Sequence, residues 1–582
     1  MRVPKFLLLA MILAVVPRPA DVRAQASRPT HNRAGSGQAQ IHPDAEKIRA
    51  HVRFLASDSL EGRGTGQRGG DRAADYIAKQ FASYGLYPAG DNGSYFQAIP
   101  MVEVKTLTDT SFNLVAANLE TMTLRNLEDF VTSNESRTVS AYIDAPIVFI
   151  GYGIKAPEYD WDDYKGTDLS GKVALLFSDE PPAGDAEFFN GRALTYYGGW
   201  RYKFKETARH GAIATLIIHR ADATGEGWAV VRNSFGKKRS YLTGSDAPGL
   251  RAASWIRSAA AEKLAAMAGL SLDQLSRQAN SRDFRPFELP LRLQAHVASE
   301  LQPFVAKNVL AALPSRGALS QEAVLYTAHY DHLGIDPAMS GHNIYNGAVD
   351  NATGCGVLLE VARAWSRTAS TPPRTIVFAA LTAEDQGLLG SEYLSHHAPV
   401  PPGRISLGLN YDALLPIGDP EEVVVSGAER TTFYVAVEAQ AKALKLAIRP
   451  NPPEAEGSYY RSTAFSLARA GIPSFSIAEG HKFTGHDVAW GEAQERDYLE
   501  KRHRQPTDQY FPEMDFKGDA KLALFGYQLG LQASSQTKLV TWVPGDAFEP
   551  ERKQSQRSEE INKRLDQLNR KPPQRKAKPH RP

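Results

Sequence analysis

The alternation of short apolar runs with amphipathic stretches in the second half of the chain most constrains its fold. Short apolar runs predict strands, and longer stretches with apolar residues three or four positions apart predict helices. The predicted strands are Val324–Thr327, Thr375–Leu381, Ser406–Asn410 and Ser474–Ile477, and the predicted helices are Gly354–Trp365, Leu388–His396, Thr432–Leu446 and Asp519–Leu531. This order indicates an α/β fold, with a mixed, mostly parallel sheet and helices on both faces.

Acidic residues and a histidine follow these apolar runs, either directly or in the next loop. In such a sheet the carboxyl ends of neighbouring strands lie close together, and function gathers there. Carboxylates that converge repel each other unless a cation lies among them. Histidine with carboxylates, without cysteine, suits zinc or another divalent metal. The residues are His329, Asp331, Asp350, Glu384, Asp385 and Asp412.

The sequence lacks complete motifs of other catalytic classes. The sequence has no H-E-x-x-H zinc motif and no G-x-S-x-G nucleophile motif. Gly166–Lys172 matches part of a phosphate-binding loop, but Val173 stands where Ser or Thr is needed, and a predicted strand follows. The one cysteine, Cys355, excludes an intrachain disulfide and is expected to be structural, because it lies at a predicted helix start.

Three ordered motifs resemble those of the co-catalytic dizinc aminopeptidase family, which is related to glutamate carboxypeptidase II and the glutaminyl cyclases. They are Ala328–Gly334, Asn346–Gly354 and Ala383–Ser391. Phe54–Asp58 and Glu61–Arg63 look like the usual N-terminal segment of that family. Val148–Ile154, Asp162–Gly166 and Gly171–Val173 look like the protease-associated (PA) domain inserted in exported members.

The resemblance implies a role for each matching residue. His329 and Asp412 would hold one zinc ion, Asp350 would bridge two, and Asp385 would hold the other. Asp331 would orient His329. Glu384 would be the general base that takes a proton from the attacking water and returns it to the leaving amine. The implied function is a zinc aminopeptidase with two metal ions and peptide substrates.

Three positions depart from the family pattern. Asp385 stands where relatives carry Glu, and Thr463-Ala464 replaces a polar pair near the expected substrate pocket. Arg504 stands where relatives carry a zinc-binding His, and Arg has no lone pair to offer a metal. We expect the loop to slip by one residue, so that His503 supplies the imidazole. The alternatives are a non-catalytic peptide-binding relative with an impaired second site, or a zinc-dependent glutaminyl cyclase or carboxypeptidase.

The N-terminus predicts export. Arg2 and Lys5 precede an apolar run, Phe6–Val16, and Ala24-Gln25-Ala26 resembles a signal-peptide cleavage site. The run is too short to span a bilayer, so we expect no membrane segment in the mature chain and a periplasmic or extracellular location. The formal net charge of +2 gives no support to a nucleic-acid partner, and the sequence does not indicate the oligomeric state.

The composition, together with the family resemblance, suggests five parts along the chain. The expected parts are a signal peptide at 1–26, a flexible leader at 27–43, a discontinuous zinc peptidase domain at 44–140 and 294–540, an inserted β-rich PA-like domain at 141–293, and a basic tail at 541–582. The tail is rich in charge and poor in apolar residues, so it is expected to be disordered.

Overall fold

The structure is a computed structural model. It describes residues 42–569, except 183–188, 190–194, 221–226, 237, 245–248, 338 and 451–458. The predicted signal peptide and nearly all of the predicted leader lie outside the described residues. Among the described residues, no helix combines the length and the apolar character needed to cross a membrane.

The first sheet contains the four predicted parallel strands. They lie in the order β17 (Thr375–Leu381), β14 (Ala323–His329), β18 (Ile405–Tyr411) and β21 (Ser474–Glu479). Antiparallel strands flank this group: β13 (Phe287–Leu313) pairs with β17, and β19 (Glu422–Ser426) pairs with β21. The short strand β20 (Ala447–Ile448) runs parallel to β19. The mixed, mostly parallel sheet is therefore confirmed.

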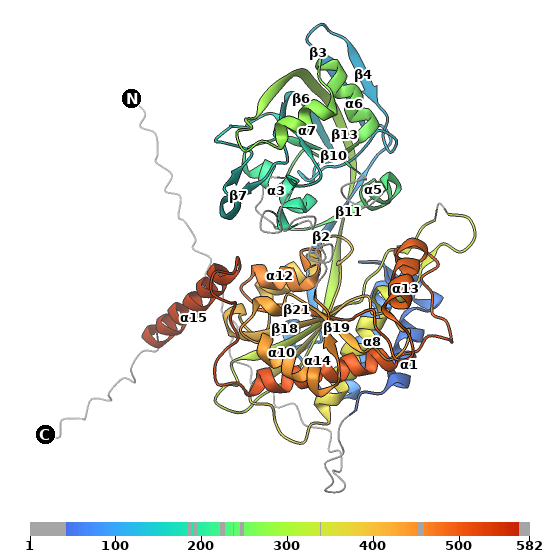
Figure 1. The fold of residues 1–582 in the computed structure, drawn as a ribbon, viewed down its shortest axis with the longest axis vertical. Coiled ribbons are helices and arrows are strands. Elements are labelled where there is room, and N and C mark those ends of the chain that lie inside the picture. The colour runs from blue at the N-terminus through green and yellow to red at the C-terminus, as the bar shows by residue number, and fades with distance from the viewer. Residues whose placement is uncertain are drawn as a thin grey trace, which may run out of the picture. The chain divides into compact units, whose positions relative to one another are not determined.

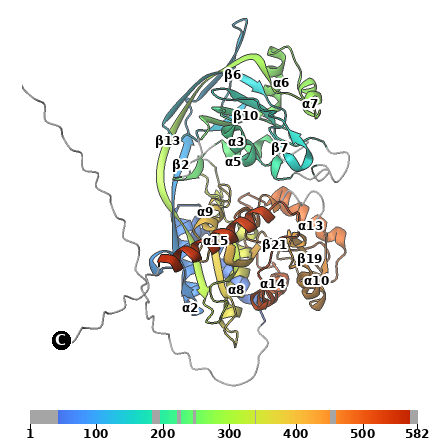
Figure 2. The ribbon, with the colours of Figure 1, turned by 90° about the vertical axis from the view of Figure 1, so that its left-hand side faces the viewer.

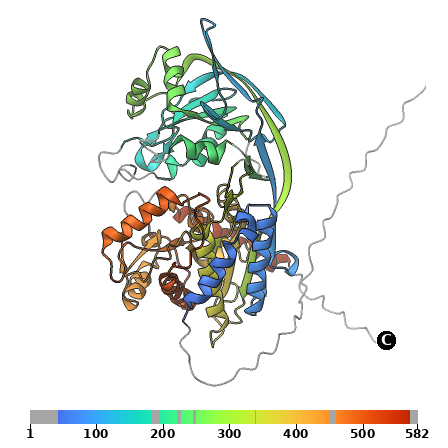
Figure 3. The ribbon, with the colours of Figure 1, turned by 90° about the vertical axis from the view of Figure 1, so that its right-hand side faces the viewer.

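Helices cover both faces of this sheet, as the alternation of side chains along each strand requires. On β17, Ile376 and Phe378 join the larger apolar core, whereas Val377 and Ala379 join a smaller core on the opposite face. The N-terminal helices, blue in Figure 3, pack on the larger core. The larger core includes residues of α1 (Ala45–Leu55), α2 (Arg68–Ser83), α8 (Gly354–Ser366), α10 (Tyr434–Ala443) and α14 (Lys517–Ser535). The smaller core includes residues of α9 (Leu389–His397) and α12 (Thr463–Arg469) (Figures 1 and 2).

A second sheet is built mainly from the middle of the chain. Its strands are β3 (Ser111–Ala116), β4 (Thr121–Leu124), β5 (Phe130–Ser133), β6 (Ser140–Phe149), β9 (Val173–Phe177), β10 (Ala214–His219) and β12 (Ala252–Arg257), with β13 between β3 and β6. Its helices are α3 (Trp200–Arg209), α5 (Trp228–Phe235), α6 (Ser258–Met267) and α7 (Leu272–Ala279). The rejected phosphate-loop motif does lead directly into strand β9.

One strand, β13, belongs to both sheets. It is 27 residues long and pairs with β3 and β6 near its start, with β2 (Phe96–Thr106) over its second half, and with β17 at its end (Figure 2). The expected domain limits at 140 and 293 are therefore wrong: β3 to β5 pair within the second sheet, and residue 293 lies inside β13. Apolar periodicity shows that a segment is extended, but it does not show which sheet the segment joins.

The remaining elements are short or peripheral. They are β1 (Tyr87–Pro88), β7 (Lys155–Ala156), β8 (Trp161–Asp162), β11 (Lys238–Leu242), β15 (Gly334–Ile335), β16 (Ile344–Tyr345) and helix α13 (Val488–Lys501). Sequence periodicity did not predict α13, which precedes the loop that carries His503 and Arg504.

The expectation of a disordered tail is wrong for part of it. Residues Glu549–Asn569 form helix α15, and Arg552 near its start is buried. Its guanidinium donates to the carbonyl oxygens of Pro402, Ile405 and Gly471 at 3.0–3.1 Å, and to that of Val540 at 3.1 Å. The composition of the tail predicted disorder because charged residues outnumber apolar ones, but a single buried Arg can donate hydrogen bonds to several backbone carbonyl oxygens.

We predict that Arg552→Ala detaches α15 from the sheet. The substitution leaves several buried carbonyl oxygens without this donor, so the free energy of unfolding should fall by about 3 kcal/mol. Urea denaturation followed by circular dichroism measures this loss. The matched control is Lys553→Ala, which alters a side chain 61% exposed beside Glu549. Equal stability of the two variants would contradict the anchoring role of Arg552.

Candidate metal centre

The predicted site residues come from the carboxyl ends of three neighbouring parallel strands and from one loop. His329 ends β14, Glu384 and Asp385 follow β17, and Asp412 follows β18. Asp350 lies in an irregular turn, Ala348–Thr353, directly before α8. The fold thus brings together residues that lie up to 83 positions apart in the sequence.

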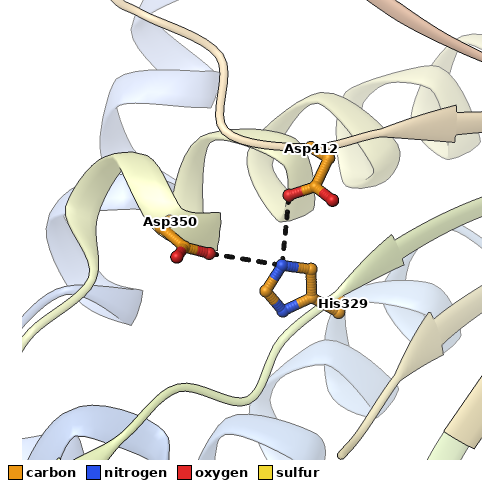
Figure 4. Close-up of side chains that lie close together, drawn as sticks. All are labelled: His329, Asp350 and Asp412. Atoms are coloured by element: carbon orange, nitrogen blue, oxygen red, sulfur yellow. Dashed lines mark hydrogen bonds and ion pairs between the residues drawn. The ribbon is translucent and has the colours of Figure 1, made fainter. Parts of the chain in front are cut away.

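Three of these side chains meet at one imidazole nitrogen (Figure 4). His329 Nε2 lies 3.1 Å from Asp412 Oδ1 and 3.3 Å from Asp350 Oδ1. His329 and Asp350 are buried, and the Asp412 side chain is 26% exposed. One nitrogen and two carboxylate oxygens, all within 4.8 Å of one another, are a donor set that fits zinc. We refer to His329, Asp350 and Asp412 as the first cluster.

The negative charge of the site changes the pKa values of its members. Burial lowers the pKa of His329, but the carboxylates of Asp412 and Glu384 outweigh it and raise that pKa well above its usual range. Burial raises the pKa of Asp350, and the cations around it, with His332 foremost, reverse this and bring it well below its usual range. The centre therefore attracts positive charge strongly.

A second cluster contains a histidine that the sequence analysis missed. His332 Nδ1 lies 3.1 Å from Asp385 Oδ2 and 3.8 Å from Asp350 Oδ2, and its side chain is fully buried. These three residues also offer one nitrogen and two oxygens within 4.8 Å. We refer to His332, Asp350 and Asp385 as the second cluster. The signal was present in the sequence, because His332 stands three residues after His329 in the motif that carries the resemblance.

The loop that follows α13 does not take the expected register. Arg504 Nη2 lies 2.8 Å from Asp385 Oδ1, so the guanidinium faces the second cluster. His503 Nε2 lies 3.8 Å from Asp350 Oδ2 with its side chain 38% exposed, and it belongs to neither cluster. The expected slip of the loop is therefore wrong. The physical reason is that the fixed positive charge of Arg504 pairs with a buried carboxylate.

Glu384 lies beside the first cluster. Burial raises its pKa well above the usual range of a carboxyl group, and Asp412 and Asp385 raise it further against the opposing effects of His329 and Arg504. Its backbone N–H donates to Asp331 Oδ1 at 3.1 Å. A carboxyl group whose pKa is raised in this way is suited to general acid–base catalysis, because its affinity for a proton lies closer to that of the reacting groups.

Asp331 is placed differently from its expected role. The nearest Asp331 acceptor for His329 Nδ1 is the backbone carbonyl oxygen at 3.2 Å, whereas the carboxylate oxygen Oδ1 lies at 3.6 Å. That carboxylate accepts hydrogen bonds from Glu384 N and from Thr65 Oγ1, the latter at 2.9 Å. Asp331 thus fixes the position of the Glu384 backbone as well as that of His329.

A buried arginine holds the loops on which the centre stands. The guanidinium of Arg63 donates to the carbonyl oxygens of Tyr330 at 2.7 Å, Asn346 at 2.5 Å and Gly347 at 2.8 Å. It also donates to Leu55 O at 2.7 Å. One planar group therefore ties the segment after His329 to the segment before Asp350. The resemblance included Arg63 but gave it no role.

Two further buried residues support the centre. Asp508 Oδ2 accepts from the backbone N–H of Asp350 at 3.1 Å, and both of its oxygens accept from Val349 N at 3.1–3.2 Å. Cys355 donates from Sγ to His329 O at 3.1 Å, and burial raises the pKa of its thiol to about 12. The structural role expected for Cys355 agrees with this burial.

The third departure from the family pattern lies away from the clusters. Thr463 and Ala464 are buried at the start of α12. A cavity of about 700 Å³ lies near them, with Tyr459, Phe465 and Arg430 among its lining residues. None of the residues of either cluster lines this cavity, so the metal centre and the cavity are separate features of the described structure.

Comparison with known proteins identifies the domain that carries this centre. Residues 308–511 match the model of peptidase family M28, and this part of the chain is an M28 peptidase domain. The predicted resemblance to zinc exopeptidases is confirmed for these residues. The PA-like nature of the second sheet stays a prediction.

The individual relatives are distant. A glutamate carboxypeptidase 2 homolog from Caenorhabditis briggsae is 30% identical over 202 residues, which is 32% of this chain and 23% of that protein. An aminopeptidase from Aneurinibacillus sp. strain AM-1 is 19% identical, with 87% of this chain and 97% of that chain covered and a TM-score of 0.48. A zinc aminopeptidase from Bacillus subtilis is 18% identical, with 88% and 98% covered and a TM-score of 0.39.

We predict that Arg63→Lys loosens the metal centre. A lysine ammonium cannot reach carbonyl oxygens on three segments at once, so the free energy of unfolding should fall by on the order of 3 kcal/mol. Zinc content measured after dialysis should fall as well. The control is Arg68→Lys, at a side chain that is 71% exposed and pairs with Glu61. A stable, zinc-loaded Arg63→Lys variant would show that this guanidinium does not organise the centre.

Proposed function

We propose that this chain is a zinc-dependent exopeptidase, an aminopeptidase that removes N-terminal residues from peptides with Glu384 as the general base. The observation that carries the proposal is the first cluster, in which His329 Nε2, Asp350 Oδ1 and Asp412 Oδ1 converge beside Glu384, a partly buried residue. The M28 match over residues 308–511 supports the same reaction class.

His329, Asp350 and Asp412 would hold the zinc ion. When bound there, zinc supplies a Lewis acid that polarises the scissile carbonyl and lowers the pKa of the attacking water. Neutral imidazole and two carboxylates are ordinary zinc ligands, and the site leaves Asp412 partly open to solvent. Access from solvent is what a catalytic site needs, in contrast to a closed structural one.

The proton steps belong to Glu384. Its carboxylate takes one proton from the attacking water, whose oxygen forms a bond to the carbonyl carbon of the substrate. As the carbon–nitrogen bond breaks, Glu384 gives this proton to the leaving amine. The raised pKa of Glu384 suits both steps, because it brings the affinity of the carboxylate for a proton closer to that of the reacting groups.

Asp331 and Thr65 act as positioning residues in this scheme. Thr65 Oγ1 donates to Asp331 Oδ2, and Asp331 Oδ1 accepts from the Glu384 backbone. The Asp331 carbonyl oxygen lies 3.2 Å from His329 Nδ1, which fixes the ring so that Nε2 faces Asp350 and Asp412. Fixing the second ring nitrogen is the usual way a ligating histidine is oriented.

We predict that Glu384→Gln retains zinc and loses turnover. Glutamine is isosteric but cannot accept the proton, so kcat should fall by about 10²- to 10⁴-fold. The measurement combines aminoacyl-anilide hydrolysis with elemental analysis of the same sample. Glu421→Gln, at an exposed position, is the control and should keep full activity. Unchanged turnover in Glu384→Gln would remove Glu384 from the mechanism.

The same assay separates the alternatives. The Arg504–Asp385 ion pair favours a non-catalytic peptide-binding relative, because it places a fixed cation on a predicted metal ligand. Wild-type protein that binds zinc but hydrolyses no anilide and no peptide would support that alternative. The substrate panel should also contain peptides with an N-terminal glutamine and peptides with a blocked N-terminus. Cyclisation of the first kind would indicate a glutaminyl cyclase, and hydrolysis at the C-terminus of the second kind would indicate a carboxypeptidase.

We also propose that the chain is exported after removal of its signal peptide. The charged start, the apolar run Phe6–Val16 and the Ala24-Gln25-Ala26 site support cleavage near Ala24 or Ala26. Mass spectrometry of the mature protein from its own host should show a chain that begins there. An intact Met1 in the exported fraction would contradict this prediction.

A further inference from the structure

The two oxygens of Asp385 already have partners from the chain itself. Asp385 Oδ1 lies 2.8 Å from Arg504 Nη2, and Asp385 Oδ2 lies 3.1 Å from His332 Nδ1. The Asp385 side chain is almost completely buried, at 1% exposure. In the first cluster, by contrast, the carboxylates pair with imidazoles. Asp412 pairs with His329, and Asp350 lies within 3.8 Å of ring nitrogens of His329, His332 and His503.

This difference matters because imidazole and guanidinium respond differently to a metal ion. A histidine can lose its proton and become a ligand, whereas an arginine keeps its charge and offers no lone pair. A cation bound to Asp385 and His332 would therefore lie beside a fixed positive charge at contact distance. The side chain of Arg504 is 37% exposed, which weakens this repulsion without removing it.

The backbone near Arg504 is tied to the centre. Four residues later in the loop, Asp508 accepts hydrogen bonds from Val349 N and Asp350 N, and its carbonyl oxygen accepts from Ala348 N at 3.1 Å. The loop also closes on itself through the hydrogen bond from Asp508 N to Gln505 O at 3.0 Å. This anchoring keeps Arg504 within reach of Asp385.

We propose that Arg504 takes the place of a second metal ion. Its guanidinium neutralises Asp385, so the chain binds one zinc ion tightly, in the first cluster, and the second cluster stays a protein-only ion pair. The inference rests on the proposed zinc site but not on the identity of the substrate. It also gives His332 a role, since His332 holds the other oxygen of Asp385 in this ion pair.

Zinc stoichiometry tests the proposal without recourse to activity. Inductively coupled plasma mass spectrometry of dialysed wild-type protein should give about one zinc ion per chain. His329→Ala should lose this ion, and His332→Ala should keep it. Two ions in the wild type, or equal losses in the two variants, would overturn the proposal.

Substitution of Arg504 supplies the converse test. Arg504→His removes the charge and adds an imidazole, so a second zinc ion should bind, with affinity raised about 100-fold or more over any second-site binding in the wild type. Arg504→Gln removes the charge without adding an imidazole, so it should raise the zinc affinity of the second cluster less than Arg504→His does. A second site that is unchanged in both variants would overturn the role of Arg504.

The two proposals fail in different ways. Folded wild-type protein that binds no zinc would overturn the zinc site of the proposed function, together with the inference that rests on it. Wild-type protein that binds two zinc ions and hydrolyses peptides would overturn the Arg504 inference alone. Thermal denaturation of each variant, compared with the wild type, identifies any that have lost metal because they have not folded.

Discussion

The convergence of carboxylates at one edge of the sheet is the constraint on which the rest of the site depends. Asp350, Asp385, Asp412 and Glu384 meet in a largely enclosed place that is open to solvent at Asp412, and their like charges repel one another there. Such an arrangement is stable only if cations lie within it. The chain provides two histidines and one arginine, and the first cluster has the donor set that would hold zinc. The function proposed here follows from how these positive charges are distributed.

The scaffold holds this charged centre by backbone contacts rather than by apolar packing alone. Parallel strands place His329, Asp385 and Asp412 at adjacent ends, and Asp350 reaches them from the turn before α8. Arg63 donates to carbonyl oxygens on both segments of the centre, and Asp508 accepts N–H groups from the turn that carries Asp350. The positive charge of Arg63 thus holds backbone carbonyl groups, and the negative charge of Asp508 holds backbone N–H groups. These contacts fix the positions of the ligands before any substrate binds.

Much of the peptidase fold could be predicted because the strands are buried on both faces and read as continuous apolar runs. β17 has the predicted limits. The pairing of β13 with both sheets could not be predicted, since extended backbone can join either sheet without a change in sequence pattern. The side-chain partners of Arg504 and Arg552 were also hidden, because a charge near the surface and a charge in a buried ion pair look the same in a sequence. His332 was missed because the family pattern assigned the imidazole to a different loop.

The most direct test of this account is X-ray diffraction from wild-type crystals grown with zinc, with data collected on both sides of the zinc absorption edge. Anomalous scattering locates each zinc ion independently of any assumption about the ligands. The account predicts one strong peak among His329 Nε2, Asp350 and Asp412, with Arg504 still paired to Asp385. A second peak of similar height among His332, Asp350 and Asp385, with Arg504 displaced, would contradict it.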